Sequence, residues 1–217
     1  MAEYYLVFRK ILVGIEFVAA LVGFMYILKL KNSYWKYFSF YLFFIFLQEF
    51  LGVNNIPFFN IPKEYYYAFI GIPIQYLFWI WLYAYKSLKN KKLFVVFIII
   101  YLSTYFPVEL YYQKIDLVYS LNLTVGTILL MILIVLEFKK QIITDDILKF
   151  KENKMFYINI GVMLFYVGTY PYFTFRKILL EDVYIDIREF YYFYFLVSNY
   201  LMYLLFTASF IWGKQES

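Results

Sequence analysis

The sequence predicts an all-α, polytopic membrane protein folded as a bundle of seven transmembrane helices. The chain is a series of apolar, aromatic-rich runs with short charged connectors between them, and each run approaches the roughly 20 helical residues that cross a bilayer core. Composition agrees, because 65% of the 217 residues are hydrophobic and 16% are charged. Soluble domains have about 45–50% and about 25%. We therefore expect one integral membrane domain over residues 1–217.

Charged, Pro-containing and Asn-containing breaks divide the chain into seven expected spans. They cover residues 9–30, 36–54, 65–86, 93–112, 116–138, 154–175 and 189–212. The second run is short and Pro107 lies near the end of the fourth, so six spans are the alternative. The first run has no small-residue cleavage site after it, which favours a retained helix over a signal peptide.

The positions of Lys and Arg predict the orientation of the bundle. Of the 20 such residues, thirteen fall on the side of the expected spans that holds the C-terminus and seven on the side that holds the N-terminus. Since positive residues collect in cytoplasmic loops, we expect the N-terminus outside and the C-terminus in the cytoplasm. The net charge of +5 comes from helix ends rather than from a basic cluster, so we expect a lipid bilayer and no nucleic acid as partner.

The absence of two residue types excludes several chemistries. The chain contains no Cys and no His, which removes thiolate catalysis, zinc sites built on nitrogen or sulfur, and haem held by His. Glu residues alone make a thin catalytic inventory. We therefore expect no enzyme activity, no metal and no cofactor.

Polar side chains inside the spans identify a candidate ligand site. Such groups are costly in lipid and by default face the interior of a bundle. In the predicted orientation nearly all of them fall in the outer halves of the spans, which predicts a net acidic, Tyr-lined pocket that opens outward and accepts a small cationic or polar ligand. The candidate ligand-binding residues are Glu16, Glu49, Gln75, Glu109, Asn122, Tyr170, Tyr172 and Asn199.

These residues also have a purely structural interpretation. Glu49 and Glu109 fit the membrane interface, and the amides fit hydrogen bonds between helices. The inner halves offer little beyond Asn159, while Glu137 falls at the inner edge, where we expect it to reach water.

Prolines and small residues predict how the helices bend and pack. Pro73, Pro107 and Pro171 would each break a helical hydrogen bond. The pairs Ala19 with Gly23, and Gly161 with Gly168, place small residues on one helix face, where they allow close helix contact.

Two stretches carry a family resemblance. Ile72-Pro73-Ile74-Gln75-Tyr76-Leu77-Phe78, and the run from Ser198-Asn199-Tyr200 to Phe210-Ile211-Trp212, resemble uncharacterised multi-span inner-membrane proteins of flavobacteria and related Bacteroidota. The resemblance implies a bacterial inner membrane and a multi-pass topology. It implies no activity, and an acid often stands in that group at the position of Gln75.

The sequence leaves two functions open. The first is a sensory or regulatory protein that binds a small ligand from outside and signals to a cytoplasmic protein through connectors 87–92 and 139–153. The second connector interleaves Ile and Leu with charges, and a helix on the membrane surface is the structure we expect there. The alternative function is a transporter of small solutes or cations, which places its site near the midplane. Span 189–212 contains no Lys, which argues against a retinal protein.

Overall fold

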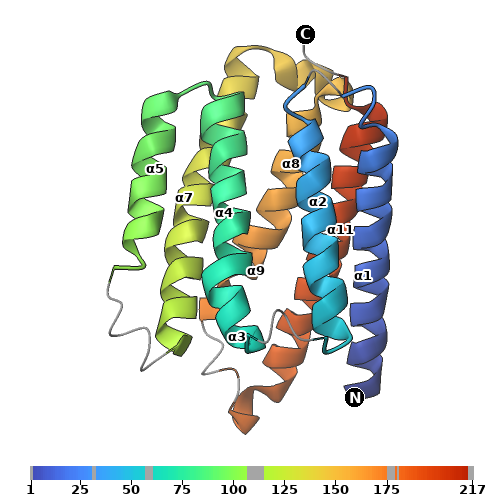
Figure 1. Ribbon diagram of the computed structural model, residues 1–217, viewed down its shortest axis with the longest axis vertical. Coiled ribbons are helices and arrows are strands. Elements are labelled where there is room, and N and C mark those ends of the chain that lie inside the picture. The colour runs from blue at the N-terminus through green and yellow to red at the C-terminus, as the bar shows by residue number, and fades with distance from the viewer. Residues whose placement is uncertain are drawn as a thin grey trace. The chain divides into compact units, whose positions relative to one another are not determined.

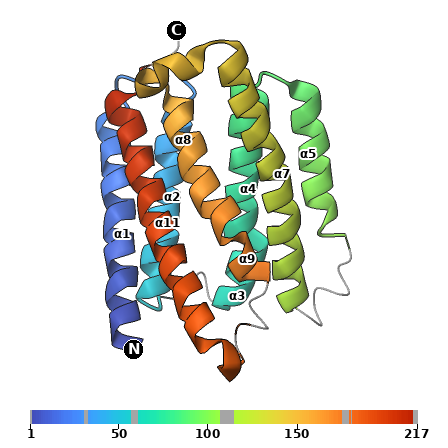
Figure 2. The same cartoon turned by 180° about the vertical axis from the view of Figure 1, so that it is seen from behind.

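The structure, a computed structural model, describes residues 2–30, 33–56, 61–106, 115–174, 179 and 181–214. Within these ranges the regular structure is helical and contains no strand (Figures 1 and 2). The expected all-α class is therefore confirmed. The number of membrane spans is a separate question.

Helices overlap all seven expected spans. In chain order the structure has α1 (Ala2–Met25), α2 (Lys36–Val53), α3 (Lys63–Tyr66), η1 (Tyr67–Gly71), α4 (Ile72–Ile80), η2 (Trp81–Ser87), α5 (Lys91–Ser103), α7 (Ile115–Ile143), η3 (Asp146–Glu152), α8 (Lys154–Val162), η4 (Met163–Val167), α9 (Gly168–Thr174), η5 (Asp182–Tyr184) and α11 (Ile185–Trp212). The first helix ends at Met25, before the expected residue 30, and α5 ends at Ser103. The rest of the fourth expected span, from Pro107 onward, lies outside the described residues.

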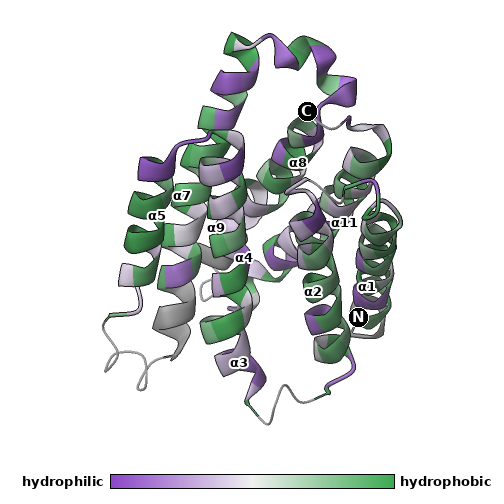
Figure 3. Cartoon of the chain, turned by 45° about the horizontal axis from the view of Figure 1, so that its top comes forward, coloured by the Kyte–Doolittle hydropathy of each residue, from purple (hydrophilic) through white to green (hydrophobic). Residues whose placement is uncertain are grey.

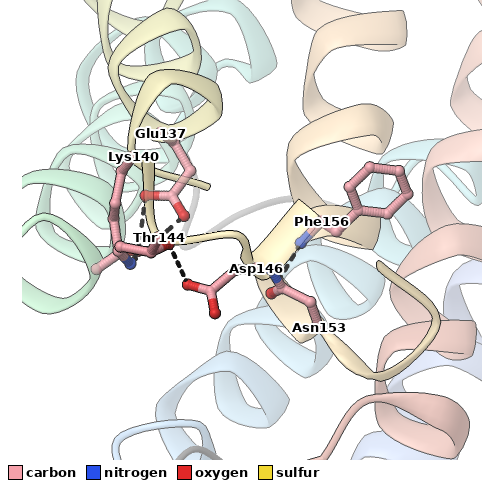
Figure 4. A network of polar contacts seen from close by, with 7 residues as sticks. Glu137, Lys140, Thr144, Asp146, Asn153 and Phe156 are labelled. Carbon is pink, nitrogen blue, oxygen red and sulfur yellow. Dashed lines mark hydrogen bonds and ion pairs between the residues drawn. The ribbon is translucent and has the colours of Figure 1, made fainter. Parts of the chain in front are cut away.

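Side-chain caps explain where two helices begin. The Asn90 side chain accepts a 3.0 Å hydrogen bond from the Leu93 amide at the start of α5. At the start of α8 the Asn153 side chain accepts a 3.3 Å bond from the Phe156 amide (Figure 4). Each cap satisfies an amide that has no partner within the helix. Both Asn residues therefore fix the register of the helix that follows.

Four helical segments of the described chain are long and apolar enough to cross a membrane. They are Lys36–Val53, Lys63–Ser87, Leu121–Ile143 and Ile185–Trp212. Large apolar side chains such as Ile99, Val135 and Phe193 are at least 60% exposed along the helices, and Figure 3 shows hydrophobic colour along much of α1, α2 and α5. Such extended apolar surface is costly in water and suits lipid. Several helices thus have membrane-span character.

The chain folds as two compact units, which we describe separately. Unit 1 comprises Met1–Ile56, Gln141–Thr169 and Asp186–Ser217, and unit 2 comprises Pro57–Lys140 and Tyr170–Ile185. Unit 1 therefore contains α1, α2, η3, α8, η4 and most of α11. Unit 2 contains the helix from α3 to η2, together with α5 and nearly all of α7.

Small residues hold the helices of unit 1 together. The Ser39 hydroxyl of α2 donates a 2.9 Å hydrogen bond to the Gly23 carbonyl of α1. A Cβ at Gly23 would lie 3.3 Å from the Phe210 ring of α11, and one at Gly161 would lie 3.3 Å from the backbone of Met202. Glycine at both positions lets the helix backbones approach closely. The predicted packing roles of Gly23 and Gly161 are confirmed.

Unit 2 is organised around a close contact between α4 and α7. A Cβ at Gly126 would lie 2.8 Å from the Tyr76 ring, so glycine leaves room for that ring. The Tyr76 hydroxyl pairs with the Thr127 hydroxyl at 2.8 Å. Tyr76 is only 2% exposed, and its ring lies 5.5 Å from the ring of Tyr101, centroid to centroid.

The structure corrects the expectation that Glu137 reaches water. Glu137 is 0% exposed, and its carboxylate accepts a 2.7 Å hydrogen bond from the Ser87 hydroxyl at the end of η2. The Lys140 ammonium lies 3.7 Å from the same carboxylate and donates a 3.0 Å bond to Ser87 Oγ. Figure 4 shows the carboxylate of Glu137 turned toward Lys140. The sequence places Glu137 at a span edge but does not show that η2 covers it.

The connector 139–153 also differs from the surface helix we expected. Helix α7 continues to Ile143, Asp145 has a left-handed backbone with φ 57°, and a 3₁₀ helix, η3, follows. The Thr144 hydroxyl donates a 2.5 Å bond to Asp146 (Figure 4). Because the left-handed residue stops α7, the chain turns there instead of extending the helix. Leu148 is 78% exposed on the resulting segment.

Two prolines stand next to π-helical turns. The π-helix η1 directly precedes Pro73, and η4 ends four residues before Pro171, which lies inside α9. A proline removes one helical hydrogen bond and crowds the preceding turn, and a wider turn relieves that crowding. Irregular turns therefore accompany both prolines, as the sequence predicts for helix breaks.

Candidate cation site

Glu16 of α1 is the most deeply buried carboxylate in unit 1. Its side chain is 2% exposed, and it accepts a hydrogen bond from Tyr203 of α11. The other carboxylate oxygen, Oε2, is buried and has no hydrogen-bond partner among the described residues. A buried, ionised carboxylate without a countercharge costs several kcal/mol. Glu16 therefore either holds a proton or requires a cation beside Oε2.

A second carboxylate lies near the first. Glu49 of α2 is half-buried and close enough to Glu16 for electrostatic interaction. Two nearby carboxylates repel each other unless a positive charge lies between them or one is protonated. Arg9 also interacts electrostatically with Glu16, but it is exposed at the beginning of α1 and leaves Oε2 without a hydrogen bond. The pair therefore still favours uptake of a cation.

Neutral oxygen groups surround the two acids. Tyr203 is 5% exposed and interacts electrostatically with the side chains of Tyr41 and Tyr166. Asn199 lies one turn before Tyr203, so the two share a face of α11, and its buried Oδ1 has no hydrogen-bond partner among the described residues. Carboxylate, phenol and amide oxygens are hard donors, which suit a proton, an alkali or alkaline-earth ion, or an ammonium group.

The helix packing of unit 1 places these groups at one level. Helices α1 and α11 run side by side in the same direction (Figures 1 and 2). The Tyr200 hydroxyl donates a 2.6 Å bond to the Phe8 carbonyl, and the Gly23 contact with Phe210 repeats the pairing farther along. Glu16 lies between Phe8 and Gly23 on α1, and Tyr203 lies between Tyr200 and Phe210 on α11. The register of the two helices therefore brings Glu16 and Tyr203 together.

Other predicted site residues lie in unit 2. Asn122 is 0% exposed, and its Oδ1 accepts a 2.7 Å hydrogen bond from the Thr104 hydroxyl of the turn after α5. Its Nδ2 is buried and has no hydrogen-bond partner among the described residues. Gln75 and Tyr170 are half-buried. The described contacts make Asn122 a link between α7 and the end of α5, as the structural interpretation of the amides expects.

Two predicted residues cannot be placed in either group. Glu109 lies outside the described residues, as does the side chain of Tyr172. Within unit 1 the structure brings together Glu16 and Glu49 and places Asn199 one turn away from the Tyr203 contact.

Tyr203 is a site residue that the sequence does not single out. A signal was present, because Asn199 and Tyr203 are four residues apart and so occupy one helix face. With 27 Tyr residues in the chain, that spacing alone does not distinguish this Tyr from one facing lipid. The partner Glu16 is distant in the sequence and becomes visible only in the fold.

The described residues contain no group of three or more His, Cys, Asp or Glu side chains placed to hold a metal ion. The Glu16 site, with two carboxylates, a phenol and an amide, therefore suits a weakly held monovalent cation better than a tightly held divalent one. Comparison with protein-family models, curated proteins and solved structures finds no match.

Proposed function

We propose that the chain is a seven-span protein of the bacterial cytoplasmic membrane that binds a small cation at Glu16 and signals this binding to a cytoplasmic partner. In this proposal the N-terminus lies outside and the C-terminus in the cytoplasm. The observation that carries the proposal is the buried Oε2 of Glu16, which has no hydrogen-bond partner among the described residues. Charged groups inside membrane proteins are costly and usually functional.

A path for the signal runs along α11. The helix that carries Tyr203 continues to Trp212, and the Lys214 amide just beyond it donates a 2.7 Å hydrogen bond to the Glu152 carbonyl of η3. The Lys214 ammonium also pairs with the Glu152 carboxylate at 2.5 Å. A shift of α11 on cation binding would therefore pull on η3. This links the Glu16 site to the 139–153 connector within one unit.

The partner surface in this proposal is the connector 139–153. Ile143 is 70% exposed and Leu148 78% exposed, and lysines and acids alternate with them. Figure 3 shows hydrophilic colour concentrated on this part of the chain. Exposed apolar side chains among charges suit a protein contact. The basic connector 87–92 is a second contact for the same partner.

Transport of the cation is the second candidate function. Transporters use interrupted helices to build sites inside the membrane, and π-turns next to Pro73 and Pro171 are such interruptions. The buried acid fits either function. The two candidates differ in whether the cation crosses the membrane.

Proteoliposome flux separates the two functions. Na⁺, K⁺ and methylammonium uptake would be measured for the wild type and for Glu16→Gln, with the exposed Glu64→Gln as matched control. A sensory protein binds a cation without saturable flux. Saturable flux that Glu16→Gln abolishes and Glu64→Gln preserves would replace the sensory proposal with transport.

A further inference from the structure

A cavity of about 210 Å³ lies in unit 1, where α8 begins and α11 ends. It is independent of the Glu16 site, since none of its lining residues belongs to that site. The cavity is lined by Trp35, Asp146, Lys149, Glu152, Asn153, Lys154, Met155 and Lys214.

Lys154 is a buried cation in the wall of this cavity. Its side chain is 5% exposed, and its ammonium lies 5.8 Å from the centroid of the Trp35 ring and 5.7 Å from that of Phe210. Among the described residues it has no carboxylate within ion-pair distance. Ring faces attract a cation, but they only partly replace the water that it has lost. The ammonium therefore favours an anion in the cavity.

The charges around the cavity leave a positive balance. Glu152 is paired with Lys214 at 2.5 Å, so these two cancel. Asp146 accepts a bond from Thr144 and faces two uncancelled cations, Lys149 and Lys154. The cavity also lies at the N-terminus of α8, which continues as helix through η4. A helix N-terminus adds positive potential of its own.

The local backbone is built around the Lys154 side chain. A Cβ at Gly213 would overlap Lys154 Cγ and would lie 3.1 Å from its Cα. Glycine therefore leaves the path that the Lys154 side chain follows into the cavity wall. The hydrogen bond from the Lys214 amide to the Glu152 carbonyl closes the other side.

We propose that this cavity binds a phosphate group, held by Lys154 and Lys149 at the N-terminus of α8. Two cations and a helix N-terminus match the charge and the several oxygens of a phosphate better than a single carboxylate. Trp35, beside the Lys154 ammonium, is a residue type enriched at the membrane interface. The phosphate therefore comes either from an anionic lipid headgroup or from a free phosphate ion.

The test separates these two sources. Purified protein in nonionic detergent is titrated with inorganic phosphate by calorimetry, and retention of phosphatidylglycerol after delipidation is measured by mass spectrometry. We expect Lys154→Gln to weaken one of these two interactions on the order of tenfold, as expected for loss of a charge-assisted bond. Lys149→Gln should weaken it less, because Lys149 is exposed. Which interaction responds identifies the source.

Lys151→Gln is the matched control, because Lys151 is exposed, lies in the same segment and does not line the cavity. It should bind like the wild type. If Lys154→Gln does not fold, Lys149→Gln against Lys151→Gln makes the same comparison. Equal binding by all variants, equal loss in Lys151→Gln, or no binding of either ligand by the wild type would overturn the proposal.

Discussion

The ring of Tyr76 occupies the space that a side chain at residue 126 would fill, since a Cβ on Gly126 would stand 2.8 Å from three ring atoms. Tyr76 is 2% exposed and its hydroxyl is bonded to Thr127. The ring therefore has little freedom to move away. The contact between α4 and α7 depends on the absence of one methyl group.

Gly126→Ala should destabilise the protein because the added methyl overpacks this contact. We expect a loss of about 1–3 kcal/mol in the free energy of unfolding, measured by SDS titration in mixed micelles. Gly14→Ala is the control, because nothing lies within 4 Å of a Cβ at Gly14. Alanine is the better helix former, so the control should gain up to about 1 kcal/mol. Equal effects of the two substitutions would contradict the packing assigned to Tyr76.

Ser87→Ala should also destabilise the protein. It removes the 2.7 Å hydrogen bond to the fully buried Glu137 carboxylate, and a charged group that loses a buried partner costs about 1–3 kcal/mol. Ser103 donates only to a carbonyl of its own helix and is exposed, so Ser103→Ala should change stability by less than about 0.5 kcal/mol. The same SDS titration compares the two. A Ser87→Ala variant as stable as Ser103→Ala would show that Lys140 alone satisfies Glu137.

The positions of helices follow from hydropathy, but the environment of a charged residue does not. The run of apolar residues in 36–54 predicted α2 to within one residue, because its ends carry charged and Asn breaks. Hydropathy likewise placed Glu137 and Lys154 near helix ends, where solvent contact is the usual outcome. The structure buries both, since Ser87 covers one and Trp35 with Phe210 covers the other. These covers come from distant segments.

The candidate site was predicted in part for the same reason. Glu16 stood out because an acid within an apolar run is costly wherever the helix points. Tyr203 did not stand out, because a tyrosine is compatible with lipid, interface and core alike. Only the register between α1 and α11, set by contacts such as Tyr200 with Phe8, distinguishes it.

A double-substitution cycle tests whether Asn122 is a structural link. Thr104→Val leaves the buried Asn122 Oδ1 without its 2.7 Å bond, and we expect a loss of about 1–3 kcal/mol. Adding Asn122→Leu removes the polar group that was left behind. The double variant should therefore be more stable than the sum of the two single losses predicts, by at least about 0.5 kcal/mol. Strict additivity in SDS unfolding would mean that the two side chains do not interact.

Glu16→Gln should stabilise the protein when no cation is supplied. It replaces a buried acid, whose Oε2 lacks a hydrogen-bond partner among the described residues, with a neutral amide of similar shape. Removing an uncompensated buried charge often gains about 1 kcal/mol or more. The gain should appear as a higher midpoint in SDS titration at low salt. A large loss instead would mean that the Glu16 carboxylate is held by contacts that the amide cannot make.

Cation-dependent stability is the decisive measurement for the Glu16 site. The thermal midpoint of the purified protein would be measured at constant ionic strength while Na⁺, K⁺ or methylammonium replaces choline, for the wild type, Glu16→Gln and Glu64→Gln. A cation that binds the folded protein stabilises it by RT ln(1 + [L]/Kd), about 2.7 kcal/mol at 100 times Kd. We predict that at least one cation raises the midpoint of the wild type and of Glu64→Gln but not of Glu16→Gln. The same midpoints in choline and in every cation, or a rise that Glu16→Gln retains, would contradict cation binding at Glu16.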